Sequence, residues 1–147
     1  MAHVRQQIRN AVVSAITGLT TTGSRVYRHR LYPLANANLP GLVVYTDEES
    51  TEYLTMGSNR TIQHTLSLKI EAYVKAVQDY DNILDQINVE ISDALSADVT
   101  LGNLAKDTQI TAFSAAGEAD GEQPAYIGVF QVQVAYMTKE DDQETAV

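Results

Sequence analysis

Apolar residues recur at three- and four-residue steps in two segments of the chain. The first stripe consists of Val4, Ile8, Ala11, Val12, Ala15, Ile16 and Leu19. The second consists of Tyr80, Ile83, Leu84, Ile87, Ile91, Ala94 and Leu95. Because an α-helix turns once every 3.6 residues, both stripes predict amphipathic helices with a single apolar face. Gly18 and the threonine run that follows it are expected to end the first helix.

A third segment, residues 60–74, alternates strictly between two kinds of side chain. One set is mostly apolar and comprises Ile62, His64, Leu66, Leu68, Ile70, Ala72 and Val74. The intervening residues are mostly polar. A period of two over about fifteen residues predicts a strand about 50 Å long with one buried and one wet face. A small sheet does not need such a length, so we expect the start of this strand to project as an arm.

Four other segments have the character of shorter strands: 24–30, Leu42–Tyr45, 107–115 and Ala125–Thr138. In the third of these, Ile110 and Phe113 are the expected inward residues. The connection 47–59 is acidic at its start and rich in Gly, Ser and Asn at its end, so we expect a long loop. Long ordered loops tend to carry function.

The element order is therefore α-β-β-β-α-β-β, which predicts an α+β fold. We expect an antiparallel (mixed) sheet of about five strands with two helices on one face, because each helix has a single apolar stripe to bury. Residues 1–138 are expected to form one domain. Residues 139–147 are acidic and aperiodic, and we expect a disordered tail.

Composition narrows the possible functions. The chain has no cysteine, which excludes disulfides and thiolate chemistry. No apolar run approaches the ~20 residues of a membrane span, and no signal-peptide pattern is visible, so a cytoplasmic location is expected. The first 46 residues carry +5 and no acid, whereas the remaining residues carry −14. Such polarity is compatible with a nucleic-acid patch, with unlike faces that pair between identical copies, or with arginines that are simply solvated.

No pattern of catalytic or metal-binding residues emerges. The three histidines, His3, His29 and His64, lack metal-ligand spacing, and no nucleophile elbow or phosphate loop is present. His64 falls on the apolar face of its strand, which favours a hydrogen-bonded core histidine. Asp81 and Asp85 share a helix face at i,i+4, a spacing more typical of a solvated surface than of a cation site. We therefore expect no enzyme activity, cofactor or metal.

Several segments together resemble the tail terminator proteins of long-tailed bacteriophages and the related minor tail and tail-completion proteins. The segments that carry the resemblance are Val4–Ile16, Arg25–Tyr27, 39–45 and Tyr126–Thr138. The resemblance implies a structural virion protein without catalytic residues. It also implies a ring, typically a hexamer, that caps the tail tube, contacts the tube protein and joins the head-neck complex after assembly in the host cytoplasm.

Two groups of residues are candidates for these contacts. A ring needs two unlike faces on each subunit, so we expect basic residues of one copy to meet acidic residues of the next. The residues of this hypothetical subunit interface are Arg25, Arg28, Arg30, Asp79, Asp81 and Asp85. The hypothetical partner-docking loop is Tyr53, Leu54, Thr55 and Met56. Two alternatives remain open: a head-tail connector or neck protein that contacts DNA in the channel, and an accessory domain that binds a small ligand.

Overall fold

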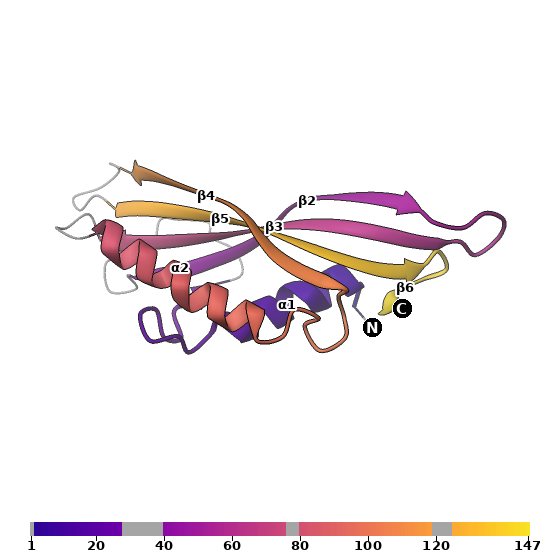
Figure 1. Ribbon diagram of the computed structural model, residues 1–147, viewed down its shortest axis with the longest axis horizontal. Helices are drawn as coiled ribbons and strands as arrows, with labels where there is room; N and C mark the ends of the chain where they lie inside the picture. The colour runs from indigo at the N-terminus through magenta and orange to yellow at the C-terminus, as the bar shows by residue number, and fades with distance from the viewer. Residues whose placement is uncertain (1, 28–39, 76–79, 119–124) are drawn as a thin grey trace.

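The structure is a computed structural model that describes residues 2–27, 40–75, 80–118 and 125–147. Its elements follow the predicted order, with one further strand at the end. They are α1 (Val4–Ile16), β1 (Val26–Tyr27), β2 (Gly41–Tyr53), β3 (Thr61–Lys75), α2 (Tyr80–Ser96), β4 (Asp107–Glu118), β5 (Ala125–Lys139) and β6 (Asp142–Ala146). Both helices lie on the same side of the strands (Figure 1).

The strands form one open, mixed sheet in the order β1-β2-β3-β5-β4, with β6 paired to β5. β1 runs parallel to β2, and all other pairs are antiparallel. The expected α+β class and element order are confirmed. Of the strand expected at 24–30, the structure shows Val26–Tyr27, and residues 28–30 lie outside the described residues.

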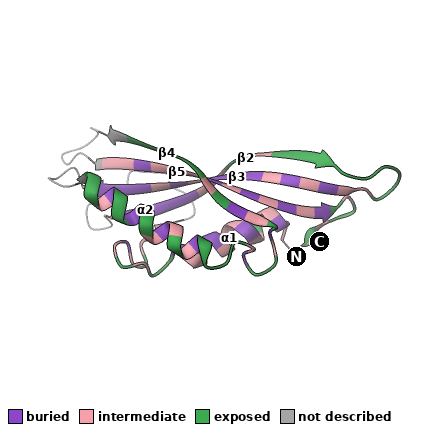
Figure 2. Cartoon of the chain, viewed as in Figure 1, coloured by how far each residue is buried: buried purple, intermediate pink, exposed green. Residues whose placement is uncertain are grey.

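The main core lies between the two helices and one face of the sheet. The alternating residues of β3 from Leu66 to Val74 face this core and are almost completely buried. From the helices, Ile8 and Val12 of α1 and Ile87 and Ile91 of α2 are fully buried. Figure 2 shows the buried residues along the strands and on the sheet-facing side of the helices. Both predicted apolar stripes are therefore core stripes.

β2 continues through the acidic segment that was expected to be a loop, and this expectation is wrong for residues 47–53. A β-bulge between Thr46 and Glu48 shifts the register against β3 by one residue. Before the bulge, even-numbered residues of β2 share a face with the apolar set of β3; after it, Glu49 and Thr51 do. The expected arm is present as a hairpin. We call residues 48–66 the arm and residues 53–60 its tip.

The C-terminal residues are ordered by pairing, so the expectation of a disordered tail is also wrong. β5 reaches Lys139, and β6 pairs with its end. The start of α1 fixes β6 further: Nε2 of His3 lies 3.0 Å from Oε1 of Gln143, and Nε2 of Gln7 donates to the Glu144 carbonyl at 2.8 Å. Main-chain pairing does not require apolar side chains, and for this reason the polar sequence of β6 gave no signal.

β4 carries a second bulge, between Ile110 and Ala112. It places Ile110 and Phe113 on the helix-facing side although they are three residues apart. Ile110 packs on the core, but Phe113 stays 43% exposed while its ring lies 4.9 Å from that of Phe130. A Cβ on Gly128 would lie 2.9 Å from the Phe113 ring, so this glycine allows the ring to approach β5 closely.

Candidate docking arm and interface residues

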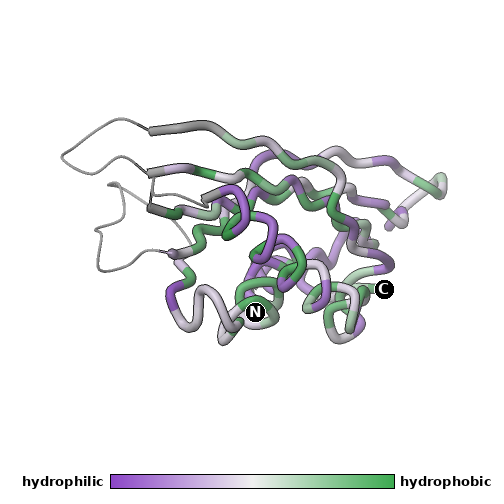
Figure 3. The backbone as a smooth tube through the Cα atoms, turned by 60° about the vertical axis from the view of Figure 1, so that its left-hand side comes forward, coloured by the Kyte–Doolittle hydropathy of each residue, from purple (hydrophilic) through white to green (hydrophobic). Residues whose placement is uncertain are grey.

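The tip of the arm presents apolar side chains to solvent. Tyr53 is 50% exposed, Leu54 45% and Met56 96%. The chain reverses through Gly57 (φ 92°) and Asn59 (φ 52°), both in the left-handed region that suits these residue types. Figure 3 shows hydrophobic colour at the end of this hairpin. Three of the four predicted docking residues thus form an exposed apolar group.

The fourth residue, Thr55, helps to shape the tip. Its Oγ1 accepts a hydrogen bond from the backbone N–H of Thr61 at 2.9 Å, and Leu54 N–H donates to the Thr61 carbonyl at 2.8 Å. These bonds close the hairpin. The tip is therefore a folded turn whose apolar side chains project from a hydrogen-bonded base.

The turn between β5 and β6 braces the base of the tip. The Arg60 guanidinium donates to both carboxylate oxygens of Glu140, at 2.8 and 3.2 Å, and lies 4.3 Å from the ring centre of Tyr53. The Asp141 N–H donates to Oδ1 of Asn59 at 3.3 Å. The hydrogen bond from Arg60 lowers the pKa of Glu140, so this brace is fully ionised at neutral pH. Together these contacts fix the direction in which the tip points.

Where the arm meets α1, the helix-facing side of the sheet carries a largely buried polar group that we call the Glu49 cluster. Its members are Arg5, Glu49, His64, Tyr136 and Thr138. Glu49 is central: Arg5 donates to Oε2 at 2.6 Å and to Oε1 at 3.3 Å, and the Tyr136 hydroxyl donates to Oε1. The cluster therefore ties the first turn of α1 to β2 and β5.

Burial and charge set the ionisation of the cluster. Burial acts to raise the pKa of Glu49, but the hydrogen bonds from Arg5 and Tyr136 outweigh it, so the pKa lies below its usual value. Burial lowers the pKa of His64, and the nearby Glu49 carboxylate offsets this only in part. Burial, together with the bond to Glu49, raises the pKa of the Tyr136 hydroxyl. At neutral pH the cluster holds an anionic Glu49 and a neutral His64.

His64 is the hydrogen-bonded core histidine that the alternation predicted. It is 2% exposed, its Nε2 lies 2.8 Å from Oγ1 of Thr138, and its ring stacks on Tyr136 with centroids 4.4 Å apart. Its Nδ1 lies 3.4 Å from Oε2 of Glu49, too far for a good hydrogen bond. Sequence reasoning missed Glu49 because the bulge at residue 47 turns it inward.

The residues of the hypothetical charged interface lie in different settings. Arg25 is partly buried, and its guanidinium donates to the Pro40 carbonyl at 2.7 Å and to the Thr21 carbonyl at 3.3 Å. Asp81 and Asp85 are exposed on α2. Arg28, Arg30 and Asp79 lie outside the described residues. The structure therefore assigns Arg25 an intrachain role and leaves the two aspartates accessible.

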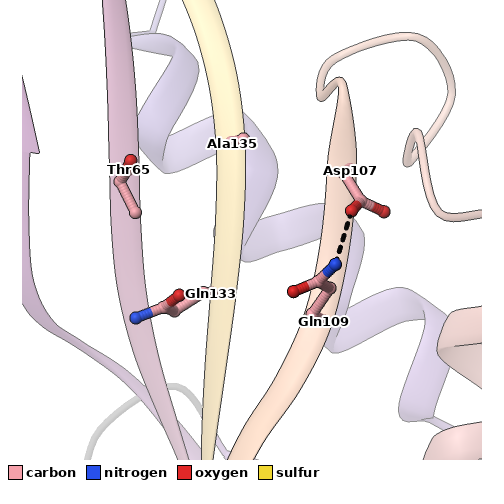
Figure 4. A pocket seen from close by; sticks show the side chains of 5 residues that line it. All are labelled: Thr65, Asp107, Gln109, Gln133 and Ala135. Atoms are coloured by element: carbon pink, nitrogen blue, oxygen red, sulfur yellow. Dashed lines mark hydrogen bonds between the residues drawn. The ribbon is translucent and has the colours of Figure 1, made fainter. Parts of the chain in front are cut away.

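The sheet face opposite the helices carries a small apolar cluster around the buried Val43 and Tyr73 and is mainly polar elsewhere. It has a shallow hollow of about 200 Å³ lined by Thr65, Asp107, Gln109, Gln133 and Ala135. Figure 4 shows these side chains on three adjacent strands, with the Gln109 amide donating to Asp107 at 2.9 Å. In the described ranges, no group of three potential metal ligands occurs, and no helix has the length and apolar character to cross a bilayer.

Comparison with known proteins identifies the family. A family model described as phage minor tail protein U matches residues 3–136. One similar solved chain is described as "Virion of native gene transfer agent (GTA) particle"; it is 21% identical, with a TM-score of 0.44, over 90% of this chain and 92% of that chain. No match is found among curated proteins. The resemblance to phage tail proteins is thus confirmed, and the chain belongs to the phage minor tail protein U family of structural tail proteins.

Proposed function

We propose that this protein is a tail terminator: copies form a ring, typically hexameric, that caps the tail tube and joins it to the head-neck complex. The observation that carries the proposal is the arm, a braced hairpin that holds Tyr53, Leu54 and Met56 in solvent. The chain belongs to a phage tail family, and this supports the view that the exposed side chains contact another protein of the tail.

The arm is built for contact with another protein. Exposed large apolar side chains that gather at one place mark interaction surfaces more often than isolated ones do. The tip contributes little to the core, because its side chains lie beyond the residues that the helices cover. Its base is nevertheless held by the Arg60–Glu140 pair, so it can dock without first becoming ordered.

Ring formation needs a second, heterologous contact between copies. The exposed Asp81 and Asp85 on α2 are available for the acidic side of such a contact, and Arg28 and Arg30 are the proposed basic side. Arg25 already donates to two carbonyls, so its part in the contact is the smallest. Exposed pairs contribute only about 0.2–1 kcal/mol each, and the ring therefore requires other contacts as well.

A tip variant tests the docking role. The double substitution Leu54→Ser and Met56→Ser is expected to leave the fold and the ring mass unchanged and to abolish capping of tail tubes. Val89→Ser is the control, since Val89 is also an exposed apolar residue (53%) but lies on α2, away from the tip. Light scattering gives the mass, and electron microscopy of tails assembled with each variant gives the capping. Normal capping by the tip variant would refute the docking role.

A charge variant tests the ring separately. The double substitution Asp81→Lys and Asp85→Lys is expected to lower the fraction of protein in rings most strongly at low salt. At high salt, screening already weakens the charged contact in the wild type, so the two proteins should differ less. A wild-type protein that remains monomeric at every concentration would overturn the proposed function itself.

A further inference from the structure

Acidic residues flank the exposed apolar tip on two sides. Glu52 is the last residue of β2 before the tip, and Asp141 lies in the turn between β5 and β6, where its N–H bonds to Asn59 of the tip. β3 lies between β2 and β5 in the sheet, so the two acidic residues lie on opposite sides of the second strand of the hairpin. We call Glu52 and Asp141 the acidic rim.

The charge of this region is unbalanced. Residues 48–60 and 139–147 contain seven acidic and two basic residues. Both basic residues are engaged: Arg60 holds the glutamate carboxylate of the β5–β6 turn, and Lys139 donates to a threonine hydroxyl of β3 at 2.8 Å. The side chains of Glu52 and Asp141 are exposed, and within the described part of the chain their carboxylates form no hydrogen bond or ion pair.

An apolar centre with a charged rim is the usual anatomy of one half of a protein interface. Aromatic residues and methionine are enriched at the centre of such interfaces, and the rim is polar. At the tip, Tyr53, Leu54 and Met56 supply the apolar centre, and Met56 is 96% exposed. The acidic rim supplies charges of one sign. Such a rim favours a partner of the opposite sign, because like charges that meet across an interface repel each other.

We propose that the tip docks on a protein surface whose apolar hollow is surrounded by lysine or arginine side chains. This inference rests on the proposed function, in which the tip docks on the tail tube, and it adds the chemistry of the tube's side of the contact. Leu54 and Met56 enter the hollow, and Glu52 and Asp141 pair with the basic groups around it. Because these charges are exposed, they act mainly on the rate of association and on its dependence on salt.

The same charges argue against a nucleic acid as the occupant. A phosphate backbone is bound through lysine and arginine, and Arg60, the one basic residue in the sequence of the tip, is already paired with Glu140. Membranes with anionic lipids also attract basic segments. A basic protein surface is therefore the occupant that the apolar exposure and the charge of the tip both favour.

Charge variants of the acidic rim test the inference. Glu52→Gln with Asp141→Asn removes two carboxylates and leaves the main-chain bond of residue 141 in place. We expect this variant to associate with uncapped tail tubes about fivefold more slowly than wild type at low salt, and to differ less at high salt. Glu52→Lys with Asp141→Lys should associate more slowly still. Surface plasmon resonance with immobilised tubes gives the rates, and circular dichroism checks the fold.

Asp93→Asn is the control, because it removes an exposed charge from α2 in the body. It should associate as fast as wild type. An equal loss of rate in this variant would show that only the overall charge of the protein matters, and the inference would be overturned.

Other results would also overturn the inference. One is a neutralised rim variant that associates as fast as wild type at low salt; another is a wild-type rate that does not fall as salt rises. A rim variant that docks normally but self-associates would show that the carboxylates keep the tips of separate copies apart. In all these cases the proposed docking role still stands if Leu54→Ser with Met56→Ser abolishes capping, whereas normal capping by that variant would refute the docking role itself.

Discussion

β3 and β5 pass through two regions of the protein that are held together in different ways. In the body, the strands lie against α1 and α2, and the contact is almost wholly apolar, with residues such as Ile70 and Ile91 fully buried. In the arm, beyond the Glu49 cluster, the helices no longer cover the sheet (Figure 1). There, apart from the buried Ile62, the contacts are mainly hydrogen bonds and ion pairs, from Arg5–Glu49 at the base to Arg60–Glu140 near the tip.

The difference separates stability from contact with other proteins. Burial of apolar surface dominates folding free energy, so the body determines whether the chain folds. The contacts of the arm determine its shape and the direction in which its tip points, and they have only a small effect on stability. Substitutions in the two regions should therefore differ in the size of their effect on unfolding.

The largest effect is expected in the body. Ile91→Ala removes a fully buried side chain between α2 and the sheet and should lower the free energy of unfolding by about 2–5 kcal/mol. Val89→Ala on the exposed side of the same helix should change it by less than about 0.5 kcal/mol. Urea unfolding followed by circular dichroism measures both. Equal effects would contradict the assignment of the core.

A smaller effect is expected at the junction of body and arm. Glu49→Ala leaves the buried Tyr136 hydroxyl without its acceptor and should cost about 1–3 kcal/mol. Tyr136→Phe, which removes the donor and keeps the ring, is the companion for a double-mutant cycle. A coupling energy near zero between the two substitutions would show that their hydrogen bond is not formed in solution.

The same cluster predicts how stability depends on pH. Both Glu49 and His64 have lowered pKa values, so for each group the unfolded chain takes up the proton first as pH falls. Stability is thus lost in two stages, the first below about 6.5 and the second below about 4.3. His64→Gln should remove the first stage and Glu49→Gln should weaken the second. Thermal melts between pH 3 and 8 would refute this if the variants followed the wild-type curve.

The smallest effect on unfolding is expected near the tip. Arg60→Ala removes an exposed ion pair and the contact with Tyr53, and the midpoint of global unfolding should stay nearly unchanged. The amides of Leu54 and Thr61 should nevertheless exchange hydrogen faster, because the brace on the turn is lost. Lys69→Ala, which removes a longer pair within the sheet, is the control. Unchanged exchange at the tip would mean that Arg60 does not brace it.

The sequence was most informative where side-chain periodicity was unbroken. The alternation of residues 60–74 located β3 almost exactly as the structure has it, at Thr61–Lys75, and both helices followed from their stripes. It was least informative where a bulge changes the periodicity. The extra residue at position 47 breaks the alternation of β2. The second half of this strand was therefore predicted to be an acidic loop, and the inward direction of Glu49 was missed.

Contacts between residues far apart in the chain could not be predicted from the sequence alone either. The bond between Arg60 and Glu140 joins residues that only the pairing of β3 with β5 brings together. The exposure of the tip was predictable, because the alternating segment 60–74 is longer than the core of a small domain. The engagement of Arg25 with two carbonyls could not, because it depends on how the turn before β1 is folded.

The long central ladder has a mechanical consequence. β3 and β5 are paired without interruption from Thr61 and Lys139 near the tip to Lys75 and Ala125 at the far end of the body. A force applied along the arm would act on this ladder in shear, so many hydrogen bonds of the β3–β5 pair would share it at once.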